Sequence, residues 1–217
     1  KRQEDAERLG YNHADAWRTL LRTHRNDIAA AMKIPPEDFR WYAAFHDEGN
    51  HPHVHMMAWS VKPNQTYLSK DGIRQIKSTL TNQIFHQELL HVYEQKSKSR
   101  DELVAEARKA MLELAKAMRE MTCIHPEAEQ MIWNLSRQLA QVGGKKTYGY
   151  LPKPMKKLVD EIVDQMARLP TVDACYQTWW ELQCQVEDYY SEEKKRLRSP
   201  LSQQKEFRQI KNAVIRE

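Results

Sequence analysis

The sequence has 217 residues, of which 41% are hydrophobic and 29% are charged, with a formal net charge of +4. This is the balance of an ordinary globular protein, long enough for one large domain or two small ones. The small excess of positive charge permits a polyanionic partner without requiring one. Only 6 glycines occur, and Glu, Lys, Gln, Leu and Ala are plentiful, so the composition favours helix over sheet.

The composition argues against a membrane protein and against a disulfide-bonded one. There is no run of about 18 apolar residues, which a membrane-spanning helix would need, and the charged N-terminus lacks the apolar stretch of a signal peptide. The cysteines are an odd number and none forms a CxxC pair, so they do not indicate a disulfide framework. We therefore expect a cytoplasmic protein that does not insert into a membrane.

The first part of the chain predicts a helix followed by a hairpin. Apolar residues recur at helical spacing over residues 12–32, and Pro35-Pro36 ends that pattern. Residues 39–46 are rich in aromatic side chains, and residues 47–50 have the composition of a tight turn. With residues 51–60 as the second strand, this segment predicts an antiparallel hairpin.

The remainder predicts only helices. Their expected ranges are 70–95, a helix that begins at a Ser99–Glu102 capping box, 126 to the Gly143-Gly144 pair, 154–169, 172–198 and a last helix after Pro200. Two of them carry narrow apolar stripes at alternating spacings of three and four residues. Such stripes fit either an extended helical arm that forms an oligomer interface or a small bundle that packs on itself. The expected fold class is α+β, with domains at residues 1–97 and 98–217.

Four of the 9 histidines lie in one ten-residue segment of the predicted hairpin, residues 46–55: His46, His51, His53 and His55. Residues two apart on a strand share a face, so the last three point the same way, and His46 lies across the turn from them. Imidazole is a common ligand of divalent metals, and three protein ligands leave a position open for substrate. We interpret His46, His53 and His55 as a catalytic metal site and leave the role of His51 open; the alternative is a row of structural histidines.

Two other groups of residues are candidates for contact with nucleic acid. In the glycine-flanked stretch 143–150, Lys145 and Lys146 can neutralise phosphates and Tyr148 can stack on an unpaired base, although an interhelical hinge explains the same composition. Arg22 and Arg25 lie near one face of the first predicted helix, where spacing alone suggests an approach to DNA.

The histidine segment FHDEGNHPHVHMMAWS resembles the metal motif of HUH endonucleases, in which an apolar residue separates two histidines and a third lies upstream. Its details are similar to those of mobilisation relaxases of the MobP or MobL type. The stretch LLRTHRNDIAAAM is also similar to the helix that precedes the motif in those proteins. The resemblance covers residues 12–97, and the helical remainder looks like the continuation of the same proteins.

This resemblance implies a relaxase-like core around the hairpin and a site- and strand-specific DNA nickase that acts in conjugative mobilisation. A divalent ion (Mn or Mg, with Zn as an alternative) held by His46, His53 and His55 would bind the scissile phosphate of single-stranded DNA at a transfer origin. A tyrosine would attack that phosphorus, form a 5′-phosphotyrosyl bond and release a 3′-hydroxyl, in a step that can be reversed. Accessory transfer proteins are further expected partners.

The sequence departs from the family pattern at the nucleophile. Relaxases of this type carry it near the N-terminus, on or just after an early strand, and none of the 9 tyrosines in this chain has that setting. We expect the catalytic tyrosine upstream of this chain, so that this fragment would lack it. The Tyr189-Tyr190 pair fits a paired nucleophile or, more simply, two aromatic residues on a helix face.

Two rival functions remain open. One is a non-catalytic DNA-binding or assembly module whose helices recruit other transfer proteins. The other is a metallohydrolase that uses a metal-bound water and no tyrosine. Covalent trapping of DNA separates the relaxase from both, and cleavage without an adduct favours the hydrolase.

Overall fold

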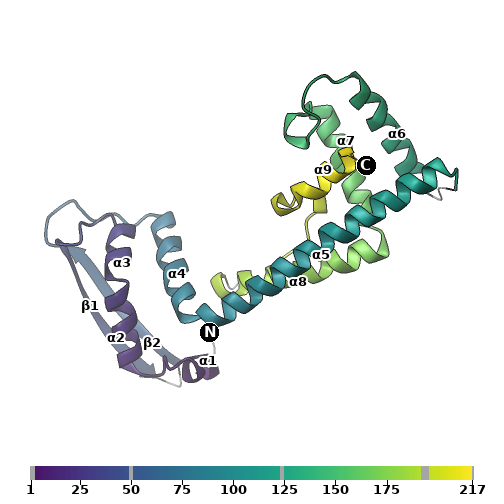
Figure 1. Ribbon diagram of the computed structural model, residues 1–217. Helices are drawn as coiled ribbons and strands as arrows, with labels where there is room; N and C mark the ends of the chain where they lie inside the picture. The colour runs from purple at the N-terminus through teal and green to yellow at the C-terminus, as the bar shows by residue number, and fades with distance from the viewer. Residues whose placement is uncertain (1–2, 49–50, 123–124, 192–195, 217) are drawn as a thin grey trace. The chain divides into compact units, whose positions relative to one another are not determined.

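The computed structural model describes residues 3–48, 51–122, 125–191 and 196–216. The chain divides into two compact units, Lys1–Leu90 and His91–Glu217 (Figure 1). The first contains a two-stranded antiparallel sheet, and the described part of the second contains helices and turns. The α+β class and the predominance of helix are therefore confirmed.

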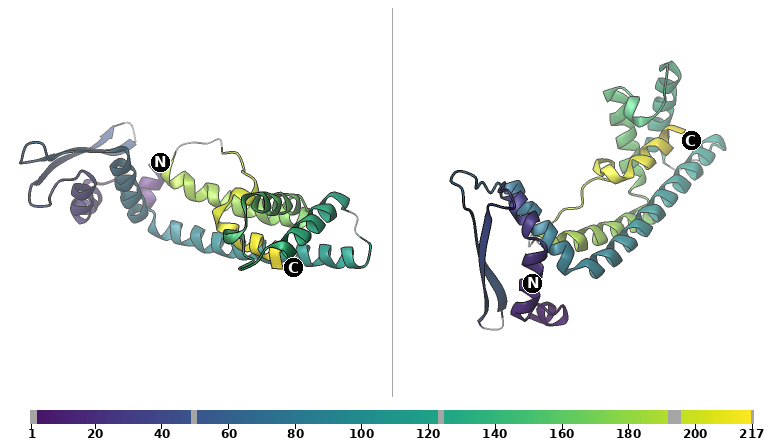
Figure 2. Two further views of the ribbon diagram at one scale, coloured as in Figure 1. Left: turned by 90° about the horizontal axis from the view of Figure 1, so that it is seen from above. Right: turned by 60° about the vertical axis from the view of Figure 1, so that its left-hand side comes forward.

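Unit 1 is a hairpin covered by helices on one face. The two strands pair along their whole length, from Phe39 opposite Ser60 to Glu48 opposite His51. Figure 2 shows the helices of this unit on one side of the hairpin only. The elements are α1 (Gln3–Arg8), α2 (Ala14–Thr23), α3 (Arg25–Ala31), β1 (Phe39–Glu48), β2 (His51–Ser60) and α4 (Lys70–Ile84).

The core of unit 1 uses every second residue of each strand. Leu21, Ile28 and Phe39 are buried at its centre. Trp41 of β1 packs against them together with Val54, Met56 and Ala58 of β2. The predicted alternation is therefore confirmed: the residues between the histidines face the core, and the histidines face the other side.

The prediction of a single helix over residues 12–32 is wrong, because the chain leaves helical geometry at His24. His24 has φ −98° and ψ 17°, and it ends α2 and begins α3. Its backbone N–H still donates to the Leu20 carbonyl, while its ring Nδ1 lies 2.8 Å from Asp27. The helix therefore breaks at a position where the sequence has no proline or glycine from which the break could be predicted.

Unit 2 is a helical bundle around a shared core. Leu103, Ala107 and Met111 of α5 contribute to the same buried cluster as Trp179 of α8 and Phe207. The helices with narrow apolar stripes thus form a small bundle in this unit and not an extended arm. Its helices are α5 (His86–Arg119) from His91 onward, α6 (Pro126–Gln141), α7 (Lys153–Met166), α8 (Pro170–Tyr190) and α9 (Arg208–Arg216).

Three predicted helix boundaries need correction. The helix expected over 70–95 ends at Ile84, and α5 begins at His86 after the single non-helical residue Phe85. The capping box at Ser99 is wrong: Ser99 lies inside α5 and is only 5% exposed. A serine and a glutamate three residues apart also fit a helix interior, so the motif alone did not locate a terminus. The helix expected over 172–198 ends earlier, at Tyr190.

Within residues 3–48, 51–122, 125–191 and 196–216, no helix combines the length and the apolarity that a membrane crossing requires.

Gly72 allows α4 to approach α3 closely. A Cβ built at this position would lie 2.5 Å from the Ala31 carbonyl oxygen, a backbone atom that cannot move independently. We predict that Gly72→Ala lowers the free energy of unfolding by about 1–3 kcal/mol, because the added methyl group overpacks this contact. Urea denaturation followed by circular dichroism measures the change.

Gly143→Ala is the matched control. A Cβ at Gly143 meets no atom within 4 Å, so this variant should unfold at the urea concentration of the parent. A Gly72→Ala variant as stable as the parent would contradict the close packing of α3 and α4.

Candidate metal centre

The hairpin register brings three histidines together. His46 on β1 is directly opposite His53 on β2, and His55 follows two residues further along β2, opposite Ala44. Alternation places all three on the face turned away from the core of unit 1. His46 and His53 are half-buried and His55 is exposed, so the cluster can be reached from solvent.

The three imidazole rings form a compact triangle. The ring centroids of His46 and His53 are 5.5 Å apart, and each lies 5.0 Å from the centroid of His55. The Nε2 atoms of His53 and His55 are separated by 3.2 Å. The sheet holds the backbone beneath all three rings, so their spacing is set by strand pairing rather than by a loop.

A backbone carbonyl orients the ring of His53. Its Nδ1 lies 2.7 Å from the carbonyl oxygen of His51, and because a carbonyl can only accept, Nδ1 carries the proton. The lone pair of the neutral ring is then on Nε2, the atom that faces His55. A hydrogen bond of this kind is how proteins fix the tautomer of a metal-binding histidine. His51 thus acts on the cluster through its backbone, while its own exposed ring lies 5.6 Å from that of His53.

The donor set suits a divalent ion, although the nitrogens are not yet converged on one point. Within the described residues, no three histidine, cysteine, aspartate or glutamate side chains stand in a complete ligating arrangement. The 3.2 Å between two Nε2 atoms is nevertheless close to the separation of two ligands that each bind a metal at about 2.1 Å.

Arg22 and Arg25, both predicted to contact DNA, occupy different settings in unit 1. Arg22 is exposed and lines a cavity of about 380 Å³ between α2 and the hairpin. Arg25 is half-buried, and its guanidinium donates to the carbonyls of Pro36 (2.7 Å) and Phe39 (2.9 Å). These bonds tie α3 to the start of β1, so the structure gives Arg25 a packing role of its own. Contact of either arginine with DNA stays a prediction.

The stretch 143–150 lies in unit 2 and is tied down at Tyr148. The backbone N–H of Tyr148 donates to Asn212, and its hydroxyl donates to Asp160 at 2.8 Å. Lys145 and Lys146 are exposed, and the Lys145 ammonium lies 5.4 Å from the ring centre of exposed Tyr150. The two lysines are therefore available to phosphate, whereas Tyr148 is engaged with its own unit.

Sequence reasoning missed the group that holds Tyr148. Lys211 is 8% exposed, donates to the Tyr148 hydroxyl at 3.1 Å and pairs with Asp160 at 2.7 Å. Burial by itself would lower the pKa of Lys211, but the hydrogen bonds to Asp160 and Tyr148 outweigh it and raise that pKa. Partners about 50 and 63 residues apart leave no local signal in the sequence, since only tertiary packing brings them together.

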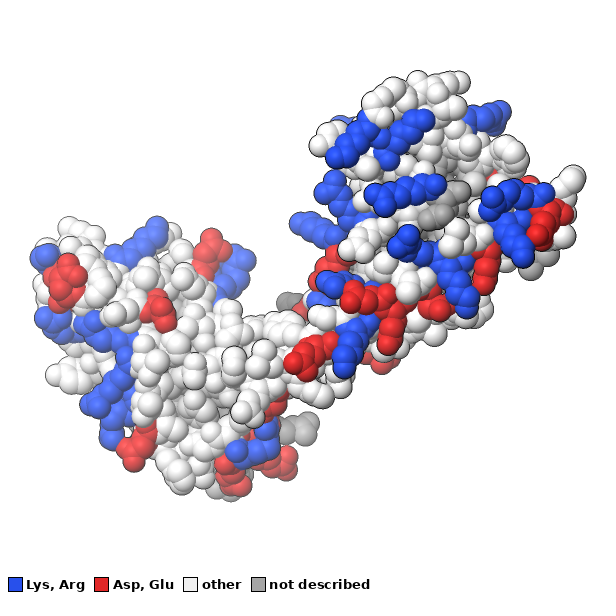
Figure 3. Space-filling view, viewed as in Figure 1, with Lys and Arg blue, Asp and Glu red and all other residues white. Residues whose placement is uncertain are grey.

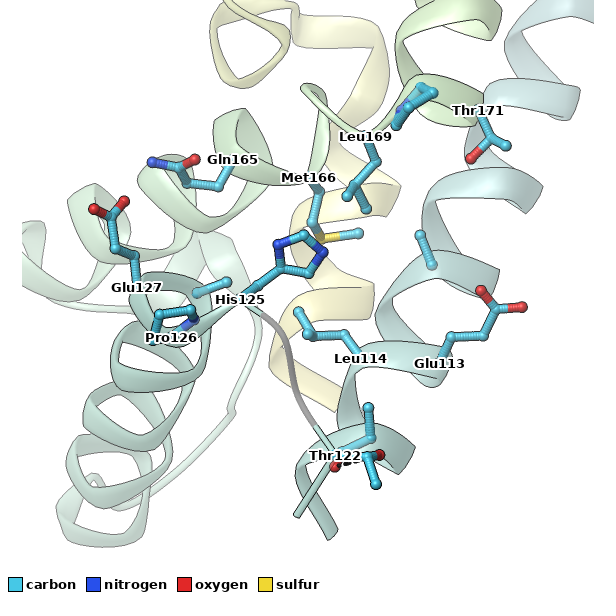
Figure 4. A pocket seen from close by; sticks show the side chains of 14 residues that line it. Glu113, Leu114, Thr122, His125, Pro126, Glu127, Gln165, Met166, Leu169 and Thr171 are labelled. Carbon is cyan, nitrogen blue, oxygen red and sulfur yellow. Dashed lines mark hydrogen bonds between the residues drawn. The ribbon is translucent and has the colours of Figure 1, made fainter. Parts of the chain in front are cut away.

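Unit 2 also contains a cavity, of about 700 Å³, which lies among α5, α6, α7 and the start of α8. Figure 4 shows His125, Met166, Leu169 and Leu114 around it. Glu113 and Glu127 also line it. None of the residues predicted to bind metal or DNA is part of this lining, so the cavity does not belong to the candidate metal centre.

The fold and the site together define an α+β protein with an accessible histidine cluster on an open sheet face. The family model for MobL relaxases matches residues 3–217, so the chain belongs to the MobL relaxase family. The relationship suggested by the histidine segment is thereby confirmed. No curated protein and no solved structure matches the chain.

The exposed lysines allow a test of phosphate contact. Figure 3 shows Lys and Arg gathered over the α7 and α9 side of unit 2, while carboxylates lie mainly along α5. We predict that Lys145→Ala with Lys146→Ala weakens binding of a labelled oligothymidylate. The slope of log K against log salt should become shallower by about 1.4, because two single-strand phosphate contacts are lost.

Lys157→Ala is the control for this measurement. Lys157 is an exposed lysine on α7 that lies 3.7 Å from Glu161, so removing it should leave the slope near that of the parent. An unchanged slope in the double variant would refute phosphate contact at Lys145 and Lys146.

Proposed function

We propose that this MobL relaxase nicks one DNA strand at a transfer origin and later rejoins it, by transesterification at a metal centre of the HUH type. The observation that carries the proposal is the meeting of three imidazoles on one open face of a rigid hairpin, in a chain of the relaxase family. The substrate is single-stranded DNA during mobilisation.

His46, His53 and His55 would hold the ion. The backbone carbonyl of His51 keeps His53 in the tautomer whose Nε2 can bind it. When bound, a divalent ion such as Mn²⁺ or Mg²⁺, with Zn²⁺ as an alternative, polarises a phosphate oxygen and stabilises the negative charge that develops there. The histidines contribute position and neutral donors, and the strand pairing keeps that position fixed while the substrate changes.

The transesterification needs a tyrosine nucleophile, which the family resemblance places on or just after an early strand. Tyr11, the first tyrosine in the chain, is poorly suited to the task, because burial raises its pKa and disfavours the phenolate. Its ring packs edge-on against Trp17 at 5.3 Å between centroids. A well-placed tyrosine beside the histidine cluster would need the opposite environment, one that favours loss of its proton.

Calorimetric titration of the metal-stripped chain with Mn²⁺ tests the centre. We expect one site in the parent and its loss in His53→Ala, because that substitution removes the best-oriented donor of the three. His13→Ala is the matched control, since His13 is exposed and makes no capping hydrogen bond at the start of α2. It should titrate like the parent.

The other outcomes are equally informative. If the parent and His53→Ala titrate alike, or if neither binds Mn²⁺, the three-histidine centre is wrong. The chain would then be better described as a DNA-binding or assembly module of the transfer apparatus. If the centre binds metal and cleaves DNA without a covalent adduct, a metal-bound water is the nucleophile and the transesterification is wrong.

A further inference from the structure

The open face of the hairpin continues beyond the histidines into an exposed aromatic patch. Tyr42 lies opposite Met57, and Arg40 lies opposite Trp59, on the same face as His46, His53 and His55. Tyr42 is 72% exposed, Met57 68% and Trp59 38%. The opposite face of the same strands packs into the core of unit 1, so this exposure is a property of one face only.

The two aromatic rings are placed beside each other without being stacked. Their centroids are 5.7 Å apart and their planes are inclined by 33°. Tyr42 keeps most of its surface open to solvent and Trp59 more than a third, which costs hydrophobic free energy that burial would recover. Contiguous exposed apolar surface of this kind commonly marks a binding site.

The charge of this face identifies the kind of partner. Between Arg40 and His46 on β1, and between His53 and Trp59 on β2, the residues on this face include no aspartate or glutamate. Arg40 donates to the carbonyls of Glu37 (2.8 Å) and Phe39 (3.0 Å), and no carboxylate pairs with it in the part of the chain that the structure describes. Aromatic faces next to an uncompensated cation suit a polyanion with exposed rings, which is single-stranded nucleic acid.

We infer that Tyr42 and Trp59 stack on unpaired bases of the DNA strand whose phosphate is held at the histidine cluster, with Arg40 beside the backbone of that strand. The identity of the strand rests on the proposed function. Along the strands, His55 lies two positions from the level of Tyr42, roughly 7 Å, and His46 lies four positions from it, roughly 13 Å. The patch therefore binds nucleotides adjacent to the reacting phosphate.

Fluorescence anisotropy with a fluorescein-labelled oligothymidylate tests this inference, with the whole chain in a buffer that contains a chelator. We expect Tyr42→Ala and Trp59→Ala each to weaken binding about tenfold, because each removes one stacking surface. Tyr42→Phe keeps the ring and should bind like the parent. Trp133→Ala is the matched control, since Trp133 is an exposed aromatic residue of α6 in the other unit.

The chelator keeps this test separate from that of the metal centre, because the DNA affinity is then measured without a bound ion. Circular dichroism establishes that the variants are folded. Binding that is unchanged in both alanine variants, or weakened as much by Trp133→Ala, would overturn the inference. So would a dimer in sedimentation that Tyr42→Ala and Trp59→Ala dissociate, because the face would then bind a second copy of the chain.

Discussion

The antiparallel register of β1 and β2 is the constraint on which the candidate site depends. It sets His46 opposite His53 and places His55 on the same face. A slip of β2 by one residue would turn His53 and His55 toward the core of unit 1 and expose the β2 residues that now pack there. The burial of the other face therefore stabilises the register, and the register in turn gathers the imidazoles. The aromatic patch follows from the same alternation, since it occupies the next positions along that face.

Much of unit 1 could be predicted because its signals are local. The turn composition after His46 and the aromatic residues before it define the hairpin, and a period of two assigns each side chain to a face. The histidine cluster follows from those two facts alone. In unit 2, Pro126 and the Gly143-Gly144 pair marked the limits of α6 for the same reason, since each constrains its own backbone.

The features that were missed depend on tertiary contacts. The break at His24 has no proline or glycine, and α5 runs through Ser99 because that serine packs inside unit 2. The Lys211–Asp160–Tyr148 group joins side chains from three segments. Likewise, the carbonyl of His51 orients His53 only through a hydrogen bond that no spacing of residue types reveals. In each case the deciding contact leaves no signal in the pattern of residue types.

The central claim is that three histidine nitrogens from one hairpin bind a single divalent ion. Pulsed electron paramagnetic resonance of the Mn²⁺-loaded chain tests it directly, because nitrogen nuclei bound to Mn²⁺ give resolved couplings whose intensity depends on their number. The account predicts couplings from three imidazole nitrogens, reduced to two in His55→Ala. A spectrum of the hydrated ion without nitrogen couplings, or one that His55→Ala leaves unchanged, would contradict it.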